Sequence, residues 1–156
     1  MKKAQRDMSD NKIERVTDRS EELAIIIRDD FYEEGIHFLT PGEYSQQLAY
    51  MHHPQGKIID AHIHNEVHRD IRFTQEVLVL KKGKLRVDFY DAQKNYLESR
   101  VLLKGDIILL ISGGHGFEVL EEVEMVEIKQ GPYIGENDKE RLSGIHAGQA
   151  VIKERS

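Results

Sequence analysis

His62 and His64 are separated by one residue in a segment, residues 57–64, that is rich in β-branched side chains. This composition predicts a strand, in which residues i and i+2 project from the same face. Two imidazoles on one face, together with a carboxylate from Glu76 and a third imidazole from His115, provide nitrogen and oxygen ligands for a first-row transition metal. The sequence therefore predicts a site for one divalent ion: Fe, Mn, Ni, Co or Zn.

The elements that must position these residues are short apolar runs separated by turn-forming residues. The first run is residues 23–27 and the last is residues 123–128. Residues 107–111 are apolar at every position, as in a strand buried on both faces. A short connection at Gly83 predicts a β-hairpin. The pattern predicts an all-β domain of about ten short strands.

Composition narrows the class of protein. The 156 residues suffice for one domain. The absence of cysteine excludes disulfides and thiolate chemistry. The net charge of −6, with both signs interspersed, argues against a nucleic-acid partner. The sequence has neither an apolar span of about 20 residues nor a secretory signal, so we expect a cytoplasmic protein without a membrane partner.

Glycines, histidines and a glutamate recur at fixed spacings in two motifs. The first motif consists of Gly56, His62, His64, Glu76 and Gly83. The second consists of Gly105-Asp106 and of His115, which follows the small residues 112–114. Through these motifs the chain resembles the cupin superfamily over residues 44–130. The resemblance implies a cupin-type jelly-roll β-barrel with one divalent metal, here held by His62, His64, Glu76 and His115.

The chain departs from the cupin pattern at two places. Eleven residues, 65–75, separate His64 from Glu76, where cupins usually have about three or four. This insertion could form a lid, or it could supply His68 or Glu66 as the fourth ligand in place of Glu76. The second motif lacks its usual proline and has one residue fewer than usual between Gly105 and His115.

The resemblance extends to small stand-alone cupins among bacterial surface-polysaccharide proteins. It implies an isomerase or epimerase that acts on a small carbohydrate-related ligand, a sugar or sugar nucleotide, and it implies a homodimer. Fold alone does not decide function. A dioxygenase, a non-enzymatic sugar- or metabolite-binding protein, and a metal-free sugar-nucleotide isomerase that uses His62 or His64 as acid or base therefore remain alternatives.

Several other residues are predicted to contact the substrate. Tyr50 and His52 would line the pocket if their side chains face inward, and Arg72 could grip a phosphate or carboxylate. Lys129 and Tyr133 follow at the end of the last strand. There Lys129 could clamp an anion, and Tyr133 could act as a general acid.

The chain is expected to have three parts. Residues 1–22 are polar and are expected to be mobile or weakly helical. Residues 23–134 form the predicted jelly-roll domain. Residues 135–156 form a polar tail that could be a short helix, an arm reaching a partner subunit, or disordered.

Overall fold

The computed structural model describes residues 12–155, which are all-β with two short 3₁₀ turns. The chain divides into two units. The first, here called the sheet unit, contains residues 12–31 and 74–155. The second, the 32–73 unit, contains a two-stranded antiparallel sheet made of β3 (Gly35–Phe38) and β4 (Ala49–His52).

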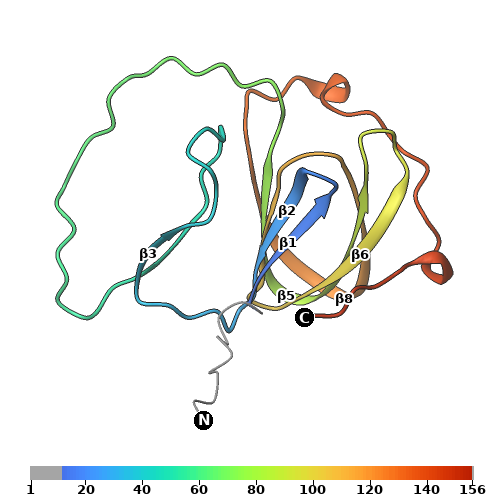
Figure 1. Cartoon of the computed structure of the whole chain (residues 1–156), viewed down its shortest axis with the longest axis horizontal. Helices are drawn as coiled ribbons and strands as arrows, with labels where there is room; N and C mark the ends of the chain where they lie inside the picture. Colours follow the sequence, from blue (N-terminus) through green and yellow to red (C-terminus); the bar gives the residue numbers. More distant parts are fainter. Residues whose placement is uncertain (1–11, 156) are drawn as a thin grey trace, which may run out of the picture. The chain divides into compact units, whose positions relative to one another are not determined.

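The sheet unit contains one strongly curled, antiparallel, six-stranded sheet that forms a half-barrel (Figure 1). Its members are β1 (Ile13–Asp18), β2 (Glu21–Ile27), β5 (Glu76–Tyr90), β6 (Tyr96–Leu103), β7 (Ile107–Leu110) and β8 (Gly114–Lys129). The strand order is β1-β2-β7-β5-β6, and β8 pairs with the other side of β5.

Apolar side chains from β1, β2, β5, β6 and β7 form a buried core on the concave side of the sheet, and Val123 of β8 packs against it. The core comprises Val16, Leu23, Ala24, Ile26, Leu78, Leu80, Leu85, Val87, Phe89, Leu102, Ile108 and Leu110. The strands predicted at residues 23–27 and 107–111 are confirmed as parts of β2 and β7. β7 is buried on both faces, because Ile108 and Leu109 project to opposite sides and are both fully buried.

β5 is one continuous strand, so the hairpin predicted at Gly83 is wrong. Gly83 has φ +85°, and a Cβ built there would lie 2.0 Å from the carbonyl oxygen of Glu122 on β8. Shifts of the β5–β8 register around this residue let both strands bend together without separating. The glycine therefore permits a bend that curls the sheet.

Two further expectations differ from the structure. Residues 13–18 form β1 instead of a mobile or helical segment. Alternate residues of this strand, Glu14 and Val16, are buried, and the strand pairs with β2. Residues 1–11 of the expected segment lie outside the described residues. The strand predicted for residues 57–64 is wrong. This segment joins no ladder among the described residues, and Ile58 and Ile63 are exposed. β propensity alone does not make a strand without a paired neighbour.

The C-terminal tail lies along β6. It contains the 3₁₀ turns η1 (Gly135–Asp138) and η2 (Ala147–Gln149). Ser99 donates its backbone N–H to Val151 and accepts a backbone hydrogen bond from Lys153, at 2.9 and 3.0 Å. The backbone N–H of Val151 also donates to the hydroxyl of Tyr96 at 2.8 Å. The tail thus continues the hydrogen bonding of the β6 edge.

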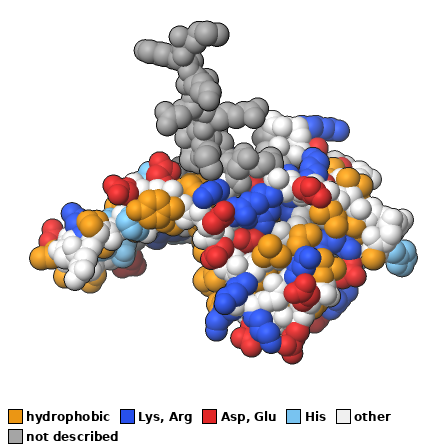
Figure 2. Space-filling view, turned by 90° about the horizontal axis from the view of Figure 1, so that it is seen from below, with side chains coloured by type: hydrophobic (Ala, Val, Ile, Leu, Met, Phe, Trp, Pro, Cys, Tyr) orange, Lys and Arg blue, Asp and Glu red, His pale blue; other side chains and the backbone are white. Residues whose placement is uncertain are grey.

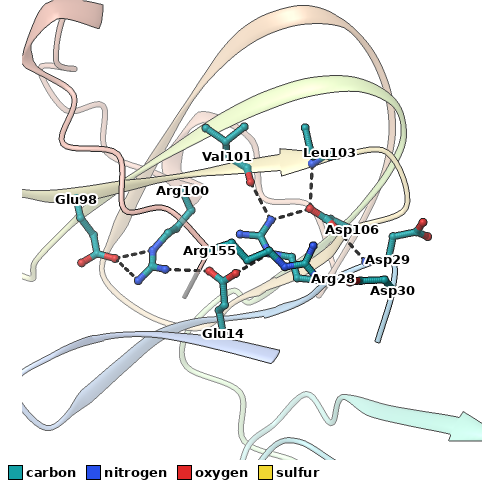
Figure 3. Close-up of polar contacts among 10 residues, drawn as sticks. All are labelled: Glu14, Arg28, Asp29, Asp30, Glu98, Arg100, Val101, Leu103, Asp106 and Arg155. Carbon is teal, nitrogen blue, oxygen red and sulfur yellow. Dashed lines mark hydrogen bonds and ion pairs between the residues drawn. The ribbon is translucent and has the colours of Figure 1, made fainter. Parts of the chain in front are cut away.

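A chain of buried ion pairs links the two ends of the β1-β2-β7-β5-β6 ladder (Figure 3). Glu14 of β1 accepts from Arg28 at 2.7 Å and from Arg100 of β6 at 2.8 Å. Arg28 also reaches Asp106 at 2.7 Å, and Arg100 reaches Glu98 at 2.8 Å. Burial alone would lower the pKa of Arg28, but its hydrogen bonds to Glu14 and Asp106 raise that pKa and keep the guanidinium charged. Charged side chains therefore hold β1 to β6.

Candidate functional site

The curl of the sheet brings Glu76, at the start of β5, against His115, at the start of β8. Glu76 shares its face with Leu78, two residues along β5, which belongs to the concave core. His115 is the cross-strand partner of Phe89, another core residue, so its side chain points to that same side. Both predicted ligands therefore face the concave side of the half-barrel.

The Nε2 atom of His115 lies 3.1 Å from Oε2 of Glu76. Both side chains are mostly covered, with 29% of the His115 side chain and 17% of the Glu76 side chain exposed. The hydrogen bond from His115 lowers the pKa of Glu76 and outweighs burial, which acts to raise it. The charges of His115, Lys129 and Lys139 lower it further. The carboxylate is thus held ionised beside an imidazole.

Lys129 and Tyr133 lie at the same end of the sheet. Lys129 is the cross-strand partner of Glu76, and its Nζ atom is 3.6 Å from Oε1 of Glu127. The same Nζ atom lies 5.8 Å from the centre of the Tyr133 ring. The ring of Phe117 lies 5.3 Å from that of His115. Four of the predicted site residues therefore gather at this end: Glu76, His115, Lys129 and Tyr133.

The remaining predicted site residues belong to the 32–73 unit. His62 and His64 lie together, with ring centres 5.2 Å apart and planes nearly perpendicular, and both are exposed. The Nδ1 atom of His62 is 2.9 Å from the carbonyl oxygen of Asp60. Arg72 is exposed and loosely paired with Asp70 at 3.4 Å.

Tyr50 and His52 lie on β4 of that unit. Tyr50 pairs with His37 on β3. The ring of His52 lies 4.8 Å from that of Tyr32, and its Nδ1 atom is buried without a hydrogen-bond partner among the described residues. Within each of the two units, the described residues form no group of three or more histidines and carboxylates arranged to hold a metal ion.

Sequence reasoning missed two residues of the Glu76–His115 surroundings. Phe117 follows His115 by two residues, so strand periodicity could have placed it on the same face. Lys139 acts on Glu76 from the tail, beyond the last strand, and no local pattern indicates this proximity.

Comparison with protein-family models, with curated proteins and with solved structures finds no match for this chain. None of the helical turns in residues 12–155 is long and apolar enough to cross a membrane. The face drawn in Figure 2 shows acidic, basic and apolar side chains interspersed among the described residues.

The lowered pKa of Glu76 makes stability depend on pH. A carboxylate whose pKa is lowered by folding stabilises the fold above its ordinary value of 4.5, and this contribution is lost as the pH falls through the folded-state value. In chelator-treated protein, we expect Glu76→Gln to be less stable than wild type at neutral pH and the difference to shrink as the pH falls below 4.5. Urea unfolding at a series of pH values measures this difference.

Glu136→Gln is the matched control for this series, since Glu136 makes only an exposed contact of 4.0 Å with Arg141. Its effect should be small at every pH. A difference between wild type and Glu76→Gln that stays constant over the range would contradict the assigned pairing.

Proposed function

We propose that the chain is a metal-binding, cupin-like enzyme of isomerase or epimerase type that acts on a small carbohydrate-related molecule. The observation that supports this most is the Glu76–His115 pair, a carboxylate oxygen and an imidazole nitrogen 3.1 Å apart on the concave side of a curled sheet. These residues come from the two separate motifs on which the cupin resemblance depends. The homodimer implied by that resemblance stays a prediction, which light scattering tests.

The donors of this pair fit a divalent transition metal in type and spacing. Imidazole nitrogens and carboxylate oxygens bind such ions at about 2.0–2.2 Å. Two donors at right angles around one ion are then about 3.0 Å apart. The observed 3.1 Å therefore suits neighbouring ligands as well as it suits a hydrogen bond. His62 and His64 stay the further ligands that the motif spacing predicts.

A bound divalent ion supplies Lewis acidity that polarises a substrate carbonyl or hydroxyl. The residues of the chain supply the rest. Glu76 and His115 would hold the ion, and the carboxylate of Glu76 is already ionised for that role. Lys129 offers an ammonium for binding, and the hydroxyl of the exposed Tyr133 can donate a proton. Proton transfer of this kind is part of the chemistry that isomerisation and epimerisation require.

Elemental analysis of the purified protein tests the metal. We expect about one equivalent of transition metal in wild type and a large loss in both His115→Ala and the double variant His62→Ala/His64→Ala. His146→Ala is the control, since His146 is an exposed residue of the tail. Wild type with no more metal than these variants would refute the metal-dependent proposal.

A second candidate is a metal-free isomerase, favoured by the direct contact between His115 and Glu76. A carboxylate that orients an imidazole is a common arrangement for a general base. Once a panel of sugars and sugar nucleotides has yielded a substrate, a strong chelator separates the two candidates. Full activity after chelation supports the metal-free enzyme, and activity lost on chelation and restored by one added ion supports the metal-dependent one.

A further inference from the structure

Lys129 is fixed beside the Glu76–His115 pair by strand pairing. It is the last residue of β8 and lies directly across the ladder from Glu76. Cross-strand partners project from the same face, so the ammonium and the carboxylate both belong to the concave side. Only 26% of the Lys129 side chain is exposed, and the Tyr133 ring lies 5.8 Å from its Nζ atom.

The acidic groups near Lys129 neutralise it only partly. Glu127 is its one described ion-pair partner, at 3.6 Å, and this carboxylate is about half exposed. A charge-assisted hydrogen bond is shorter, at about 2.7–2.9 Å. Glu76 is already engaged by His115. The ammonium therefore has donor capacity left for a ligand.

A second positive charge reinforces this end of the sheet. Lys139, in the tail just after η1, lies close enough to act on Glu76, and it has no partner among the described contacts. Two ammonium groups thus stand beside two carboxylates: Glu76, which is already hydrogen-bonded to His115, and Glu127, which is about half exposed. The ammonium groups keep donor capacity that a neutral sugar does not need, whereas a carboxylate or phosphate group would be stabilised by it.

We infer that the molecule bound at the Glu76–His115 pair carries an anionic oxygen group, a carboxylate or a phosphate, and that Lys129 selects it. This inference rests on the proposed function, because it names the class of molecule that the proposed site takes. A phosphorylated sugar and a sugar acid share the chemistry that Lys129 recognises, and the experiment distinguishes them.

The test is an NMR titration of the full-length chain with three probes: glucuronate, glucose 6-phosphate and neutral glucose. We expect at least one anionic probe to bind at millimolar concentration, about tenfold or more tightly than glucose, with shifts at residues 76 and 129. Lys129→Gln should remove this preference and Lys129→Arg should retain most of it. Lys104→Gln, at an exposed lysine of the β6–β7 turn, is the matched control and should change nothing.

The outcomes separate this inference from the proposed function. Three results would each overturn the inference. Glucose and both anionic probes could bind equally, neither anionic probe could bind, or the anion preference could survive in Lys129→Gln. None of these results bears on the metal content. If the preference depends on Lys129 but wild type holds no metal, the inference stands and the metal-dependent function fails. Whichever anionic probe binds more tightly, glucuronate or glucose 6-phosphate, shows whether the site prefers a carboxylate or a phosphate.

Discussion

Arg28→Met is expected to lower the free energy of unfolding by about 3–5 kcal/mol. The guanidinium of Arg28 lies between the carboxylates of Glu14 and Asp106, 2.7 Å from each, and all three side chains are about 95% buried or more. Removing the cation leaves two buried carboxylates, of which only Glu14 keeps an arginine partner, Arg100. Urea unfolding monitored by circular dichroism measures the loss.

An exposed ion pair of the same sheet provides the control. Arg15 of β1 pairs with Glu22 of β2, and nearly half of its side chain is exposed. Arg15→Met should therefore change stability by less than about 1 kcal/mol. If both variants lost the same small amount, the ion pairs that link β1 to β6 would contribute little to holding the curled sheet together.

Gly83→Ala is expected to destabilise the chain by about 3 kcal/mol. Alanine at φ +85° has a strained backbone, and its Cβ would overlap the main chain of β8 at Glu122, which cannot move without breaking the ladder. The free-energy costs of the strained backbone and of the displaced strand add together. Alanine also lowers the conformational entropy of the unfolded chain, and this stabilising effect offsets the two costs only partly. Thermal and urea unfolding measure the change.

Gly144→Ala is the matched control, because a Cβ at Gly144 meets no atom within 4 Å. It should be neutral within about 0.5 kcal/mol. A Gly83→Ala protein as stable as this control would mean that the bend of β5 does not require glycine.

The parts of the fold that depend on local pattern could be predicted from the sequence. The apolar runs at residues 23–27 and 107–111 predict strands, and both are strands because each is buried within the sheet. The motif spacing predicts that Glu76 and His115 are neighbours, and in the structure a carboxylate oxygen of Glu76 lies 3.1 Å from a ring nitrogen of His115. Their contact itself depends on the bend at Gly83, where the sequence indicated a hairpin.

The parts that depend on distant partners could not be predicted. Glu14 and Arg28 look like ordinary surface charges in the sequence, yet they are buried because β1 and β6 approach each other at the ends of a curled ladder. The segment 57–64 has the composition of a strand but joins no ladder among residues 12–155. The composition of a segment indicates whether it can form a strand or an ion pair. Which segments and charges meet depends on the curl of the sheet.

A manganese titration of ¹⁵N-labelled, chelator-treated protein tests most directly whether Glu76 and His115 bind the ion. Paramagnetic Mn²⁺ broadens the amide signals nearest to it. We expect substoichiometric Mn²⁺ to broaden the signals of residues 76 and 115 before any others in the sheet unit. Earlier broadening along the acidic run 121–124 of β8, or equal broadening throughout, would contradict a metal site at the Glu76–His115 pair.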